Sequence, residues 1–118
     1  MTDRVLIYVT TSGEEEAVRI ARTLVEERLV ACANVVPAVR SFYRWEGALQ
    51  DDREAAFFAK TTRDRVDDVI RRVRELHSYQ VPAILALPVL AGNAAYLAWV
   101  GDECAVAAAP GSKESADG

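Results

Sequence analysis

The stretch ACANVVPAVRSFYRW, residues 31–45, decides the fold predicted for this chain. Most of its side chains are types that favour extended backbone. They are Cys32, Val35, Val36, Val39, Phe42, Tyr43 and Trp45. Pro37 has no amide donor, so we expect a bulge or a strand edge there. Glu46–Gln50 is a turn candidate and Glu54–Thr62 a return strand, which together predict a long β-hairpin.

A strand and a helix are predicted before this hairpin. Val5–Val9 (VLIYV) is a continuous apolar run, typical of a strand that is covered on both faces. Apolar residues then recur at helical spacing from about Gly13 to Arg28. Ser12 followed by Glu15 predicts a capping box at the start of this helix.

A helix and a strand are predicted after the hairpin. The helix is expected to begin after a capping Thr61 or Thr62 and to run to His77. Ile84–Leu90 is a second buried apolar run, and Ala94–Val100 predicts a short final helix.

The resulting order, βαββαβ plus a short helix, predicts an α+β fold of the ferredoxin-like type, in which two helices cover one face of a four-stranded sheet. We expect one domain over residues 1–107 and a disordered tail over residues 108–118, which are small and polar. The strands are apolar on both faces, and the chain has no further long helix to cover the second face. We therefore expect another copy of the chain to cover it.

Composition excludes several classes of function. The 118 residues carry a net charge of −4, which argues against binding to nucleic acid or to an anionic membrane. No apolar run reaches the roughly 18 residues of a membrane span, and the N-terminus lacks the pattern of a secretory signal. Two cysteines do not form a disulfide framework. We therefore predict a reduced, cytoplasmic protein without nucleic-acid or membrane partners.

The residues that could carry chemistry allow more than one interpretation. His77, the only histidine, is a candidate metal ligand or a residue that complements the dipole at a helix C-terminus. Cys32 is a soft-metal ligand or a small buried side chain. Glu54 and Lys60 share one face of a strand, and this face either lines a cleft or is exposed to solvent. No nucleophile–base pair is recognisable, so we do not expect an enzyme.

Six segments of the chain resemble one family, the CutA proteins of divalent-cation tolerance. These segments are LVEERLVACANVVP (24–37), SFYRWEG (41–47), AKT (59–61), LHSYQVP (76–82), ALPV (86–89) and GNAAYLAW (92–99). The resemblance implies a homotrimer of ferredoxin-like subunits, similar in architecture to the PII signalling proteins, with the long hairpin reaching around a neighbour. It also implies binding of Cu²⁺ or another divalent cation and no organic cofactor.

The resemblance further implies a cleft between subunits. His77 and Cys32 are its candidate metal ligands. Its other candidate residues, for a ligand or for the interface, are Tyr43, Trp45, Glu54, Lys60, Tyr79 and Trp99. Gln80 and Ala83 stand where relatives often have glutamate, which favours copper over a hard ion. The alternative function is a PII-like scaffold that senses a small molecule or binds a protein, with incidental metal binding.

Overall fold

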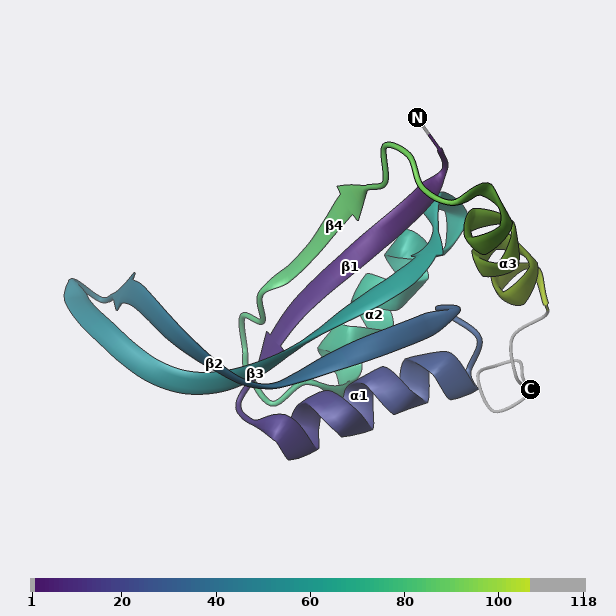
Figure 1. Cartoon of the computed structure of the whole chain (residues 1–118). Coiled ribbons are helices and arrows are strands. Elements are labelled where there is room, and N and C mark those ends of the chain that lie inside the picture. Colours follow the sequence, from purple (N-terminus) through teal and green to yellow (C-terminus); the bar gives the residue numbers. More distant parts are fainter. Residues whose placement is uncertain (1, 107–118) are drawn as a thin grey trace.

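The computed structural model describes residues 2–106, in which strands and helices follow one another in the order that the sequence predicts (Figure 1). The elements are β1 (Arg4–Thr11), α1 (Glu14–Glu26), β2 (Cys32–Trp45), β3 (Ala48–Thr62), the 3-10 turn η1 (Arg63–Arg65), α2 (Val66–Leu76), β4 (Ile84–Pro88) and α3 (Ala94–Ala105). This order confirms the ferredoxin-like α+β fold with a C-terminal helix. The predicted tail, residues 108–118, lies outside the described residues.

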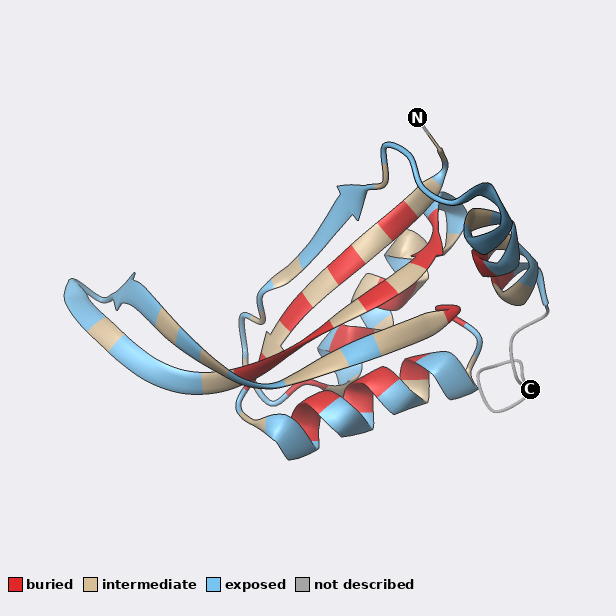
Figure 2. Cartoon of the chain, viewed as in Figure 1, coloured by how far each residue is buried: buried red, intermediate tan, exposed pale blue. Residues whose placement is uncertain are grey.

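The four strands form one antiparallel sheet in the order β2-β3-β1-β4. Side chains of β1 alternate between buried and half-buried, as Figure 2 shows. The buried set, Val5, Ile7 and Val9, points to the side covered by α1 and α2. Within residues 2–106, β1 is therefore fully covered on one face only, and not on both faces as its apolar run predicts.

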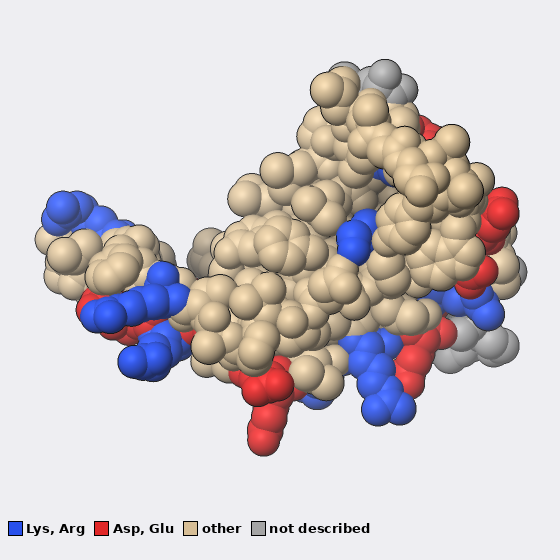
Figure 3. Space-filling model, in the orientation of Figure 1, with Lys and Arg blue, Asp and Glu red and all other residues tan. Residues whose placement is uncertain are grey.

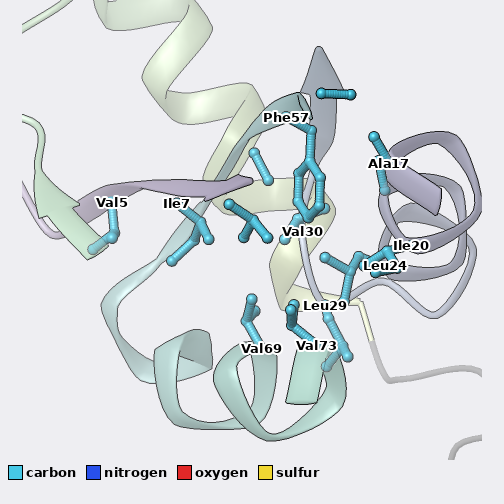
Figure 4. Packing of buried hydrophobic residues seen from close by; sticks show 14 residues of the cluster. Val5, Ile7, Ala17, Ile20, Leu24, Leu29, Val30, Phe57, Val69 and Val73 are labelled. Atoms are coloured by element: carbon cyan, nitrogen blue, oxygen red, sulfur yellow. The ribbon is translucent and has the colours of Figure 1, made fainter. Parts of the chain in front are cut away.

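The core lies between the sheet and these two helices (Figure 4). Phe57 of β3 is its largest fully buried side chain. Ile20 and Leu24 reach this core from α1, and Val69 and Val73 reach it from α2. The apolar residues at helical spacing in α1 and α2 thus face this core, except Val25 at the end of the predicted α1 stripe, which is 37% exposed. A smaller cluster of Ala31, Val100 and Cys104 holds α3 to the body.

The long hairpin of β2 and β3 extends beyond the body of the domain as an arm (Figure 1). Its register shifts between Val36 and Val39, which confirms the bulge predicted around Pro37. Its turn is formed by Glu46 and Gly47, both with positive φ, so β3 begins at Ala48. The predicted start at Glu54 and the five-residue turn are wrong because pairing continues to the tip, where Trp45 faces Ala48.

The start of α1 differs from the predicted capping box. Gly13 is the N-cap, and Ser12 lies one position before it. The Ser12 amide and hydroxyl both donate to Glu16 Oε1, at 2.9 and 2.8 Å. Because Ser12 precedes the cap, the carboxylate that reaches it comes from Glu16 and not from Glu15.

Candidate functional site

The face of the sheet opposite α1 and α2, here called the open sheet face, is built of two rows of side chains. The strand register sets these rows across the sheet. One is Cys32, Lys60, Leu6 and Leu87, and the other is Asn34, Phe58, Tyr8 and Leu85. Leu85 and Leu87 are 58% and 43% exposed. Figure 3 shows that this side of the molecule is mostly uncharged, with charges gathered on the arm and at the rim.

Cys32 lies at one end of the open sheet face, against α3. Its sulfur is 3.1 Å from the Tyr96 hydroxyl. This contact and burial raise the pKa of Tyr96 to about 12, so Tyr96 holds its proton at neutral pH. Lys60 lies opposite Cys32 and donates to the Asn34 side-chain oxygen. Trp99 packs beside Tyr96, with ring centroids 5.7 Å apart.

His77 lies at the opposite end of β1, and its side chain is fully buried. Its Nε2 is 2.7 Å from the Thr10 carbonyl oxygen, and its Nδ1 is 3.1 Å from the Tyr79 amide nitrogen. A carbonyl accepts and an amide donates, so the proton of the neutral ring belongs on Nε2. Both ring nitrogens are occupied, and in this conformation neither presents a lone pair to a metal.

Glu16 supports this end of the sheet from α1. Its Oε2 accepts the Ser78 amide at 2.7 Å and lies 3.7 Å from His77 Nδ1. Burial alone would raise the pKa of Glu16, but hydrogen bonds from Ser12 and Ser78 lower it to about 2. The carboxylate is therefore ionised at neutral pH and fixes the loop that carries His77.

Tyr79 connects this cluster to the arm. Its ring packs on His77, with centroids 4.8 Å apart, and its hydroxyl donates to Glu54 Oε2 at 2.7 Å. Further out, the Tyr43 hydroxyl donates to Asp52. Trp45 lies next to the arm's turn and is 56% exposed.

The predicted site residues thus fall into three groups. Cys32 and Lys60 lie beside α3, which carries Trp99; Glu54, His77 and Tyr79 lie at the root of the arm; and Tyr43 and Trp45 lie further out on it. The structure does not bring Cys32 and His77 together. Cys32 is level with Leu6 and His77 contacts Thr10, four residues or about 13 Å along β1. Residues 2–106 contain no group of three or more His, Cys, Asp or Glu side chains placed to hold a metal ion.

Three members of these groups are not predicted from the sequence. They are Glu16, Asn34 and Tyr96. Tyr96 and Trp99 are three residues apart on a helix, a spacing that indicates a shared face. Asn34 follows Cys32 by two residues, which places both on one face of a strand. Glu16 carried no such signal, because its partners, Ser78 and His77, are distant in sequence.

The fold and the open sheet face define a ferredoxin-like domain with an extended β2–β3 hairpin and a C-terminal helix. Residues 5–103 match the family model described as CutA1 divalent ion tolerance protein, and the chain belongs to this family. It is 45% identical over 95 residues to the divalent-cation tolerance protein CutA of Thermus thermophilus, covering 80% of this chain and 92% of that protein. These names describe cation tolerance and not an enzyme.

Solved structures agree with this assignment. The crystal structure of the divalent ion tolerance protein CutA1 from Ehrlichia chaffeensis superposes with a TM-score of 0.83 at 35% identity, covering 90% of this chain and 99% of that one. The chain spans 54% of the length of the chloroplastic protein CutA 1 of Oryza sativa. A CutA from Archaeoglobus fulgidus is described as periplasmic. Within residues 2–106 no helix is long and apolar enough to cross a membrane; the cytoplasmic location stays a prediction.

Proposed function

We propose that this protein acts in divalent-cation tolerance as a homotrimer that binds a divalent metal ion, with copper as the first candidate. Membership of the CutA1 family supports the cation-tolerance role.

The open sheet face supports assembly. Leu85 and Leu87 of β4 lie on one side of β1 and Phe58 of β3 on the other, without a covering layer from residues 2–106. Exposed apolar surface of this kind marks an interaction site. The arm carries Tyr43 and Trp45, which are further exposed aromatic side chains. The family resemblance implies that a second copy of the chain packs on both the open sheet face and the arm.

The single observation that carries the metal role is the position of the Cys32 thiol. It is partly exposed on the open sheet face, and its one hydrogen-bond contact among the described residues is the Tyr96 hydroxyl. A thiol suits soft and borderline ions such as copper. Lys60 lies opposite and repels every cation, so charge alone would not hold an ion there; the bond that soft and borderline ions form with a thiolate would.

One thiol does not complete a metal site, so further ligands would come from neighbouring copies or from His77. His77 would first have to leave the Thr10 carbonyl and the Tyr79 amide. Breaking these buried contacts costs free energy, which makes Cys32 the stronger candidate of the two. The role also requires a reduced thiol, in keeping with the predicted cytoplasmic location.

Native mass spectrometry tests both parts of this function. The protein is titrated with Cu²⁺, and in parallel with Cd²⁺, a soft ion that does not oxidise thiols. We expect three chains per particle and a fixed number of ions. Cys32→Ser is expected to abolish uptake, and Cys104→Ser, which alters a buried thiol, to preserve it. Unchanged uptake in Cys32→Ser would refute the assigned ligand, and a monomeric parent would refute the trimer.

A further inference from the structure

Lys60 carries a charge that the described residues do not balance. Its ammonium group donates to the Asn34 side-chain oxygen, which is neutral. None of the ion pairs formed among residues 2–106 includes Lys60. Its neighbours in the strand register are Cys32 and Leu6, and Phe58 is the next residue on the same face of β3. The cation therefore lies in an almost uncharged part of the open sheet face.

The other charged side chains on this face already have partners. Glu54 is the nearest carboxylate along this face of β3, but it lies six residues away, about 20 Å along the strand, and accepts from Tyr79. Arg4 pairs with Asp3 and donates to the Leu97 carbonyl oxygen. Among residues 2–106, Lys60 has no counter-charge within reach.

The groups around Lys60 are mostly hydrogen-bond donors. Lys60 has three ammonium protons and uses one on Asn34. Asn34 accepts through its oxygen, which leaves its amide protons as donors. A donor-rich set around a cation, with apolar residues on either side, is suited to an anion.

We propose that Lys60 and Asn34 bind a small oxyanion, a carboxylate or a phosphate, on the open sheet face. The inference goes beyond the proposed metal role and gives the small-molecule alternative a ligand class. The inference rests on the proposed assembly because a second copy that covers this face also buries Lys60. A buried ammonium needs a negative partner, because burial of an unpaired charge costs several kcal/mol.

A carboxylate side chain from a neighbouring copy is the competing partner, since Asp52 and Glu54 lie on the arm face that continues the open sheet face. In that case Lys60 would be neutralised within the assembly and would not bind a dissolved anion. A titration of the assembled protein separates the two arrangements.

The experiment is calorimetric titration of the full chain with inorganic phosphate and, separately, with succinate, at constant ionic strength in chloride. We expect saturable binding of at least one of the two, and the comparison between them distinguishes a phosphate site from a carboxylate site. Lys60→Gln should weaken binding about tenfold or more through loss of a charge-assisted hydrogen bond. Lys60→Arg should retain it, and so should Arg22→Gln, which removes an exposed arginine from α1.

A second variant guards against misfolding of Lys60→Gln. Asn34→Asp leaves Lys60 in place and supplies a carboxylate next to it, so it should block anion binding while the chain stays folded. Binding that is equal in Lys60→Gln and the parent, binding that survives Asn34→Asp, or no binding of either anion to the parent would each overturn the proposal. Native mass spectrometry of the same samples reports assembly independently, so loss of the trimer is not mistaken for loss of the anion site.

Discussion

Tyr79 and Glu54, which are 25 residues apart, are joined by a hydrogen bond of 2.7 Å from the Tyr79 hydroxyl to Glu54 Oε2. Tyr79 belongs to the loop between α2 and β4, and Glu54 lies on β3 at the root of the arm. Burial and the Glu54 carboxylate raise the pKa of Tyr79, so the hydroxyl keeps its proton at neutral pH. This single contact ties the loop that holds His77 to the arm.

Tyr79→Phe is predicted to lower the free energy of unfolding by about 1.5–3 kcal/mol, the usual range for a hydrogen bond to a charged group. The phenyl ring keeps its packing on His77, so the change isolates the hydroxyl. Glu54→Gln retains an acceptor and should cost less. Urea unfolding at fixed chain concentration measures both variants, and equal stability of Tyr79→Phe and the parent would contradict the prediction.

Glu16 is predicted to make the free energy of unfolding depend on pH in the acidic range. Its pKa is 4.5 in the unfolded chain and about 2 in the folded one, so the folded state favours the carboxylate. The stabilisation is complete above pH 4.5 and is lost as pH falls toward 2; it amounts to up to about 3 kcal/mol. Glu16→Gln should flatten the stability profile between these pH values in urea titrations. Glu26→Gln, a change in an exposed pair on the same helix, should leave the profile steep.

The sequence predicted the fold well because its main signals are local. Apolar spacing along α1 and α2 and the β-branched run of β1 report directly on which side chains face the core. The predicted bulge at Pro37 is confirmed for the same reason, since a missing amide donor disrupts strand pairing at its own position in the sequence. The length of the arm was underestimated, because polar residues such as Asp51 and Asp52 hide the pattern of a strand that is exposed on both faces.

The candidate site was less predictable from the sequence. His77 and Cys32 were selected by residue type and by family resemblance, and neither reveals which hydrogen bonds a side chain already makes. The contact of His77 with Thr10 joins residues 67 positions apart, and that of Cys32 with Tyr96 spans 64. Such pairs are created by sheet topology and by the packing of α3, which spacing within a single element does not encode.

The effect of Gly101→Ala on stability is predicted to depend on Arg4. A Cβ atom at Gly101 would lie 2.8 Å from Arg4 Cζ, so Gly101→Ala pushes the guanidinium aside and weakens its 2.7 Å hydrogen bond to Leu97. That loss, about 1.5–3 kcal/mol, outweighs the gain of about 1 kcal/mol from replacing glycine by alanine in a helix. The same substitution in an Arg4→Ala background should therefore be stabilising. Thermal unfolding of the four variants checks this reversal of sign.

Trp45→Ala is predicted to destabilise the assembly and not the single chain. Trp45 is 56% exposed beside the arm's turn, so its removal leaves no cavity in the core. If the arm packs on a neighbouring copy, truncating this aromatic side chain should cost about 3–5 kcal/mol per buried ring. The melting temperature should then fall at high chain concentration and converge with that of the parent on dilution to monomer. Phe57→Ala, which opens the core, should lower it at every concentration. A Trp45→Ala protein that melts with the parent throughout would show that the arm does not bind a second copy through this residue.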